Sequence, residues 1–226
     1  MSLEKNLDLV RENISIALSK SDSKEVTLVA ATKMQPFEKI VECYKSGVTS
    51  IGENRVQEAL GKFESFENMP KLKKRFIGHL QKNKVNKCLE LFDTIDSVDS
   101  NLLLNKINSR CVLLKKKIEV LLEINISEEP QKKGYKAIVD DEILKSFGYK
   151  NVIIKGLMTV GSYSQDEKKN RNQFSKMRNL KEKISHQIPQ QNFNQLSMGM
   201  SGDYTLAIEE GSTIIRLGTV LFGKRG

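Results

Sequence analysis

Apolar residues recur along this chain with two alternating spacings. From Leu3 to Leu18 they return every three or four positions, which predicts an amphipathic helix. The next apolar segment, 26–31 (VTLVAA), is continuous and begins with a β-branched residue. Such a run is typical of a strand buried on both faces. Short apolar runs and helical spacings then alternate to the C-terminus, so the pattern predicts a repeating strand–helix unit.

The pattern predicts eight strands, with a helix between each pair of neighbours. The expected strands cover 26–31, 48–51, 75–77, 92–98, 118–126, 152–160, 193–196 and 213–217. The first expected helix after a strand begins at Phe37 and is stopped by Gly47, and the next lies within 52–66 and begins near Glu53. The remaining expected helices cover 82–91, 99–114, 135–147, 166–188 and 204–210.

This alternation of apolar strands and helices predicts an α/β fold with a parallel sheet. Eight units in 226 residues fit a single-domain (β/α)₈ barrel spanning 1–226, with one extra helix before the first strand. A doubly wound open sheet is the competing fold. No GxGxxG motif follows the first expected strand, which weakens a dinucleotide site of that fold.

The chain is basic, with 37 Lys plus Arg against 28 Asp plus Glu and a net charge of +9. Such a balance permits nucleic-acid binding through phosphate neutralisation. The lysines, however, are scattered and interleaved with glutamates, and no aromatic residues alternate with them. We therefore favour solvated helix faces over a nucleic-acid surface, which stays as an alternative from another functional class.

Cysteine usage and hydropathy indicate the compartment. Cys43, Cys88 and Cys111 are odd in number, no CxxC occurs, and the two histidines lack metal-ligand spacing. We expect reduced thiols in a cytoplasmic protein, with no metal site. No run reaches the roughly 18–20 apolar residues of a membrane helix. The N-terminus lacks the apolar core of a signal peptide, so we expect no membrane association.

The first candidate for chemistry is Lys33, directly after the first strand. In a (β/α)₈ barrel the carboxyl ends of the strands carry the active site. Partial burial at the barrel mouth lowers the pKa of a lysine, and the neutral amine condenses with aldehydes to a Schiff base. The alternative is a lysine whose stem packs at a strand end while its ammonium reaches solvent.

The second candidate is a pair of glycine-containing segments after the last two strands. The segment 199–202 (GMSG) and the pair Gly218–Thr219 allow backbone N–H groups to approach an anion closely. Ser201 and Thr219 add hydroxyl groups, and a helix near Tyr204 adds its positive end. Barrels commonly hold phosphate after these two strands.

Together with Arg216 in the eighth strand, these residues suggest a phosphorylated aldehyde cofactor. Pyridoxal 5′-phosphate (PLP) fits this description. Its aldehyde would meet Lys33, its phosphate the donors between Ser201 and Thr219, and its ring nitrogen Arg216. Periodicity alone leaves open whether Arg216 meets that nitrogen or the phosphate.

At these residues the chain closely resembles the YggS/PROSC family of PLP homeostasis proteins, whose fold is the barrel domain of alanine racemase. The matching segments are VAATK (29–33), GENRVQE (52–58), RFIGHLQKNK (75–84), INIS (124–127), KGLMTV (155–160), LSMGMSGDY (196–204) and RLGTVLFG (216–223). They run in order along nearly the whole chain.

The resemblance implies a role for several residues. Lys33 resembles the family's Schiff-base lysine and Arg216 the residue that faces the pyridine nitrogen. The resemblance further implies phosphate ligands at Ser201, Gly218 and Thr219, and pocket-lining residues at Asn54 and Met158. Lys132 matches a second lysine proposed to accept PLP for transfer. Pro130 and Lys133 shift this loop locally, which leaves the choice between Lys132 and Lys133 open.

The family is regarded as a PLP carrier or regulator without established turnover, so we expect a protein that buffers PLP and hands it to apo enzymes. The alternative is a PLP-dependent amino-acid racemase. A charged arginine at the ring nitrogen would weaken the ring as an electron sink. Related racemases take a second base from a C-terminal domain across a dimer. This chain ends at Gly226, so we expect no such domain. Without that dimer surface a monomer is plausible, and the sequence leaves the oligomeric state open.

Two further residues have alternative interpretations. His79 is either a base or a hydrogen-bonded residue that fixes the loop after the third strand, and we favour the second. Glu53 is either a general acid or base, or an acid in the first turn of the following helix. We slightly favour the helix-capping role.

Overall fold

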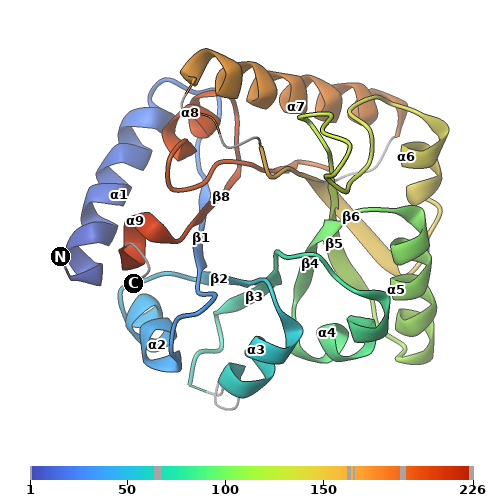
Figure 1. Cartoon of the computed structure of the whole chain (residues 1–226), viewed down its shortest axis with the longest axis horizontal. Coiled ribbons are helices and arrows are strands. Elements are labelled where there is room, and N and C mark those ends of the chain that lie inside the picture. The colour runs from blue at the N-terminus through green and yellow to red at the C-terminus, as the bar shows by residue number, and fades with distance from the viewer. Residues whose placement is uncertain (1, 64–67, 162–163, 165, 189–191, 224–226) are drawn as a thin grey trace.

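The computed structural model describes residues 2–63, 68–161, 164, 166–188 and 192–223. Within these ranges, eight parallel strands close into a barrel in which each strand pairs with the next and β8 pairs with β1 (Figure 1). The strands are β1 (Thr27–Ala31), β2 (Ser50–Glu53), β3 (Lys73–Phe76), β4 (Thr94–Val98), β5 (Ile118–Glu123), β6 (Val152–Met158), β7 (Gln195–Ser197) and β8 (Ile214–Leu217). The predicted (β/α)₈ barrel is confirmed.

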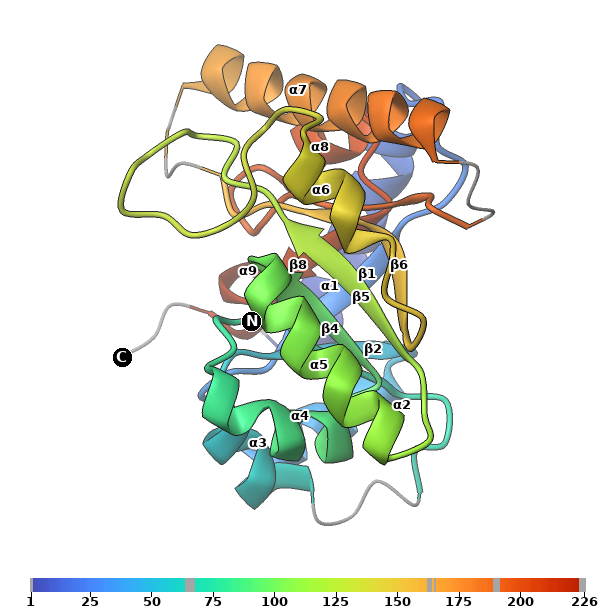
Figure 2. The ribbon, with the colours of Figure 1, turned by 90° about the vertical axis from the view of Figure 1, so that its right-hand side faces the viewer.

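Helices surround this ring of strands, as Figures 1 and 2 show from two directions. They are α1 (Leu3–Leu18), α2 (Phe37–Lys45), α3 (Val56–Lys62), α4 (Val85–Leu91), α5 (Asn101–Leu113), α6 (Asp141–Ser146), α7 (Glu167–Gln187), α8 (Tyr204–Glu209) and α9 (Thr219–Phe222). The predicted extra helix, α1, packs against α8 and α9. No helix in the described ranges is both long and apolar enough to cross a bilayer.

The helix predicted from near Glu53 starts later than expected. Glu53 is the last residue of β2, and α3 begins at Val56. Residues 64–66 of the predicted helix lie outside the described ranges. A helix-capping role for Glu53 is therefore wrong, because its backbone belongs to the sheet.

The segment after β5 also differs from the prediction. The strand ends at Glu123 instead of residue 126, and α6 covers only Asp141–Ser146 of the helix predicted over 135–147. The Asn125 side chain donates to the carbonyls of Glu129 and Lys132, which folds this segment into a loop. Tyr135 then pairs with Ile124 and is 2% exposed. Its apolar ring is therefore buried from a loop and not from the face of a helix.

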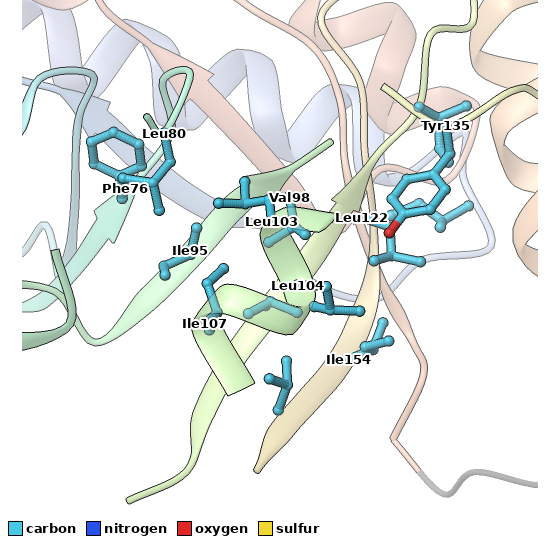
Figure 3. Close-up of a cluster of buried hydrophobic side chains, with 14 of the residues drawn as sticks. Phe76, Leu80, Ile95, Val98, Leu103, Leu104, Ile107, Leu122, Tyr135 and Ile154 are labelled. Carbon is cyan, nitrogen blue, oxygen red and sulfur yellow. The ribbon is translucent and has the colours of Figure 1, made fainter. Parts of the chain in front are cut away.

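The main apolar core lies between the strands and the outer helices. Figure 3 shows part of it, where Leu104 and Ile107 of α5 face Ile95 and Leu122 of the sheet. The barrel interior holds a separate small cluster of Val29, Leu121, Met158 and Ile214. The interior therefore contains a packed apolar layer, as filled barrels do.

All three cysteines are free, as expected, and they are buried like small apolar residues. Burial raises the pKa of the Cys43 thiol to about 12. Its thiolate is therefore scarce at neutral pH, and a nucleophilic role is disfavoured.

Gly156 is required by close strand packing. It pairs with Gln195, and a Cβ at position 156 would lie 1.8 Å from the Gln195 backbone oxygen. We expect Gly156→Ala to destabilise the protein by about 1–3 kcal/mol or more, measured by urea unfolding. The control is Gly61→Ala in α3, where a Cβ meets nothing within 4 Å. That change should stabilise by about 0.5–1 kcal/mol, and equal effects of the two substitutions would contradict the packing argument.

Candidate ligand-binding site at the barrel mouth

A cavity of about 780 Å³ opens at the carboxyl ends of the strands. It brings together six of the residues that the sequence singled out, namely Lys33, Asn54, Ser201, Arg216, Gly218 and Thr219. Met158 is fully buried in the apolar cluster of the barrel interior and does not line the cavity, and neither does Lys132. The predicted site is thus mostly assembled in one place.

The turn that carries Lys33 is held by polar contacts to β2 and α3. Thr32 Oγ1 donates to Glu53 Oε1 at 2.7 Å, and Lys62 Nζ donates to the Thr32 carbonyl at 2.9 Å. Met34 adopts a left-handed backbone conformation (φ 61°), and its N–H donates to the Glu58 carboxylate. A non-glycine residue in this conformation is strained, so these contacts fix the backbone on both sides of Lys33.

Glu53 connects this turn to α3 from inside the fold. Its side chain is fully buried, and Lys62 Nζ lies 3.0 Å from its Oε1. Burial raises the pKa of Glu53, while its hydrogen bonds from Thr32 and Lys62 oppose that shift. The sequence-based expectation missed this role because the contacts come from a neighbouring strand and from the far end of the next helix.

The segments after β7 and β8 contribute anion donors beside the same cavity. The backbone N–H groups of Gly218 and Val220 both donate to Ser201 Oγ, at 3.2 Å each. Thr219 lies between them and begins α9. Backbone amides and hydroxyl groups that converge in this way form a site for a phosphate or similar anion. Val220 was not predicted, because the backbone amide of a residue other than glycine leaves no signature in the sequence.

Arg216 lies deeper in the barrel than these donors. It is level with Val29 in the pairing of β8 with β1, two residues before Gly218. Its guanidinium is buried and donates to Ser197 Oγ at 2.6 Å and to the Thr159 carbonyl at 2.8 Å. Burial lowers the pKa of Arg216 while nearby carboxylates raise it, and arginine keeps its charge in proteins. The site therefore holds a fixed cation in its wall.

Two carboxyl groups near Arg216 are shifted toward their neutral forms. Burial, and then the charge of Asp99, raise the pKa of Glu123 to about 7, although Arg216 and Lys133 oppose this shift. Burial also raises the pKa of Asp203, whose carboxylate accepts a hydrogen bond from the Met200 N–H. Neither residue was predicted as functional. Glu123 was hidden inside an expected strand, and Asp203 in a glycine-rich loop.

The remaining candidates lie around the rim. Lys132 Nζ bonds to Glu129 Oε1 at 2.6 Å and lies 3.4 Å from the Gly161 carbonyl. Lys133 points elsewhere, toward His79, with 2.9 Å between Lys133 Nζ and His79 Nε2. His79 also contacts Asp99, so its hydrogen bonds connect three loops, in keeping with the favoured interpretation.

Comparisons with known proteins show which family the chain matches. Residues 6–226 match the family model of the alanine racemase N-terminal domain. A pyridoxal phosphate homeostasis protein of Aquifex aeolicus is 38% identical over 236 residues, covering 100% of this chain and 99% of the relative.

Solved structures show the same similarity. PipY of Synechococcus elongatus without PLP matches with a TM-score of 0.87 and 32% identity, covering 98% of this chain and 100% of PipY. PipY with PLP bound matches with a TM-score of 0.84 and 30% identity, over the same shares of both chains. Alanine racemase of Clostridium difficile is 16% identical with a TM-score of 0.73, covers 99% of this chain and 56% of the racemase, and supports the fold alone.

The raised pKa of Glu123 predicts a pH-dependent stability of the ligand-free protein. Folding raises this pKa from 4.5 to about 7, so the native state binds the proton more tightly than the unfolded chain. The resulting stabilisation is present below pH 4.5 and is lost as the pH rises through 7. Above pH 7 we expect Glu123→Gln to be more stable than the parent by on the order of 2 kcal/mol. This free energy is smaller than the full pKa shift would give, because partial contact with solvent screens the carboxylate.

This prediction is measured by urea unfolding between pH 4.5 and 8. The matched control is Glu12→Gln on the exposed face of α1, which should keep the pH dependence of the parent. A Glu123→Gln curve parallel to that of the parent would contradict the assignment.

Proposed function

The chain belongs to the alanine racemase N-terminal domain family and, within it, to the pyridoxal phosphate homeostasis proteins, and from this membership we propose that it binds PLP at the barrel mouth and holds it for other proteins. One observation carries the proposal. An amine, Lys33, and a set of anion donors around Ser201 line a single cavity, together with the fixed cation of Arg216. The PLP-bound relative PipY supports the choice of ligand.

The residues present fit the three functional groups of PLP. Lys33 offers the amine that would form a Schiff base with the aldehyde. Ser201, Thr219 and the Gly218 amide would hold the phosphate. When bound, PLP supplies an electrophilic carbonyl and an electron-withdrawing ring, while the protein supplies orientation and charge. The cavity, at about 780 Å³, has the size of ordinary cofactor pockets.

We assign Arg216 to the ring nitrogen and not to the phosphate. Its guanidinium is tied to Ser197 and Thr159, below the level of the anion donors. A permanently charged donor at that nitrogen leaves the nitrogen unprotonated. The ring then withdraws electrons weakly, which suits a carrier better than an enzyme that stabilises carbanions.

Three other residues complete the proposed site. Asn54 lines the cavity beside Lys33, and Met158 packs beneath it against Val29. We assign the second, transfer lysine to Lys132. Its Nζ is bonded to the carbonyl of Gly161, directly after Val160, which lines the cavity. The proposed recipients are apo enzymes that require PLP.

The proposal predicts that borohydride fixes PLP on Lys33. We expect the purified protein to absorb visible light when loaded with PLP, and reduction to leave a stable adduct on the peptide that contains Lys33. Lys33→Ala should lose this adduct because none of the other described residues that line the cavity carries an amine, while retaining weaker non-covalent PLP. Absorbance spectra and peptide mass spectrometry measure both effects. The control, Lys106→Ala, removes an exposed lysine of α5. Undiminished Schiff-base absorbance in Lys33→Ala would refute the assignment.

The anion donors predict a second, separable effect. Ser201→Ala removes a hydroxyl group from the proposed phosphate site while leaving the Gly218 and Val220 amides in place. A hydrogen bond to a charged group contributes about 1.5–3 kcal/mol, so we expect the Kd for PLP to rise at least about tenfold. Equilibrium dialysis measures this change. Ser185→Ala on the exposed face of α7 is the control, and equal Kd values for both variants would place the phosphate elsewhere.

A further inference from the structure

A groove lies between α7 and the segment that connects β5 to α6, apart from the cavity that Lys33 lines. Its volume is about 650 Å³, and the two hollows share no lining residue. Figures 1 and 2 both place the connecting segment beside α7. The proposed PLP site therefore does not account for this groove.

One face of α7 forms a straight wall of the groove. The residues of α7 that line it recur at helical spacing, and they are Lys176, Asn179, Leu180, Lys183, His186 and Gln187. From the first to the last they cover about three turns of helix, or roughly 16 Å. A wall of this length can accommodate about three turns of a second helix packed along it.

The other side of the groove is apolar. Residues 137–139 (Ala-Ile-Val) line it, and Ile138 is 56% exposed. Ala137 and Val139 are partly buried against the main apolar core, and Leu180 of α7, which is 4% exposed, lies at the base. The groove thus presents an aliphatic surface to solvent beside a regular helix.

The rim of the groove carries positive charge that the described part of the chain does not neutralise. Lys176 and Lys183 are exposed, and neither forms a hydrogen bond or an ion pair with a described residue. On another face of α7, by contrast, Arg178 pairs with Glu210 of α8 at 2.7 Å. Glu128 is the one carboxylate among the described lining residues. The lysines of the groove are therefore available to a partner, whereas Arg178 serves the fold.

We infer that this groove binds an acidic amphipathic helix of another protein. In helix-in-groove recognition, an apolar stripe of the ligand enters the groove and its polar flanks meet the rim. Here the stripe would cover Ile138 and Leu180, while acidic side chains would meet Lys176 and Lys183. Apolar burial would supply most of the affinity, and the exposed charges would select acidic over basic helices.

Two other occupants fit the groove less well. A nucleic acid would also meet the lysines, but no Phe, Tyr or Trp occurs among the described lining residues to stack on a base, and the apolar side would stay uncovered. Helix α1 of a second copy carries exposed Leu9, Glu12 and Ile16 at helical spacing. Lys5 precedes Leu9 by four residues on the same stripe, so that face of α1 is not uniformly acidic.

The test is fluorescence anisotropy of a labelled synthetic helix titrated with the purified full chain. The probe has about four helical turns, with leucine at every third or fourth position and glutamate on both flanks. In one matched peptide lysine replaces each glutamate, and in the other alanine replaces each leucine. We expect saturable binding of one probe per chain, at least about tenfold tighter than binding of either matched peptide.

Substitutions at exposed positions locate the bound probe. Ile138→Ala removes the apolar contact and should raise the Kd about five- to tenfold. Lys183→Glu reverses a charge at the rim and should raise the Kd about tenfold at low salt and less at high salt. The matched controls are Leu113→Ala and Lys106→Glu, which change an exposed apolar and an exposed basic residue of α5. Both controls should bind like the parent, and circular dichroism checks that all four variants fold.

Several outcomes would overturn the inference. They are the absence of saturable binding, a Kd that changes equally in Ile138→Ala and Leu113→Ala, and tighter binding of a single-stranded RNA oligonucleotide that Lys183→Glu abolishes. Self-association of the parent that Ile138→Ala removes, measured by sedimentation velocity, would assign the groove to a second copy instead. None of these measurements depends on PLP binding at Lys33.

Discussion

The site depends on the closure of the barrel between its first and last strands. Residues 27–30 of β1 pair with 214–217 of β8 in parallel register, so the carboxyl ends of both strands open at one mouth. This pairing places Lys33, Ser201 and Gly218 around the same cavity, and the Gly218 amide donates to Ser201 Oγ. An open sheet with the same strands would leave the amine and the anion donors at different places along its edge. In the function that we propose, holding an aldehyde and its phosphate together is therefore a property of closure.

Closure also buries charge, and the interior compensates for it. Arg75 pairs with Asp96 at 3.0 Å, while Arg216 is held by a hydroxyl group and a carbonyl. A buried charge without partners would cost several kcal/mol, so each of these groups must be satisfied for the barrel to form. The guanidinium of Arg216 is fixed as a result, and Glu123, beside it, keeps its proton up to a pH of about 7.

The loop after β5 directs its two adjacent lysines to different neighbours. Because Asn125 folds this segment through the carbonyls of Glu129 and Lys132, it forms no helix, and successive lysines point to different neighbours. Lys132 reaches the Gly161 carbonyl near the cavity that Lys33 lines, and Lys133 reaches His79. In a helix the same two residues would lie about 100° apart on a single surface. Their different chemical environments follow from the irregular backbone.

The sequence by itself determined the fold class and much of the site. The strands of a parallel sheet are buried on both faces and therefore appear as continuous apolar runs between helical spacings. Eight such runs indicate the barrel. Lys33, Ser201, Gly218 and Thr219 were predictable because each directly follows a strand or lies in a glycine-containing segment after one, where a barrel exposes its mouth.

The tertiary structure alone decided the contacts between distant segments. The position of Glu53 before a helix favoured a capping role. Its hydrogen-bond partners are instead Thr32 and Lys62, so Glu53 is a buried residue that holds the Lys33 turn in place. Ser197 and Thr159 orient Arg216 from two other strands, and the chain of Lys133, His79 and Asp99 joins three loops. Periodicity reports which face of an element is buried. It carries no information about which side chain from another element contacts a given atom, and the chemistry at the barrel mouth depends on those contacts.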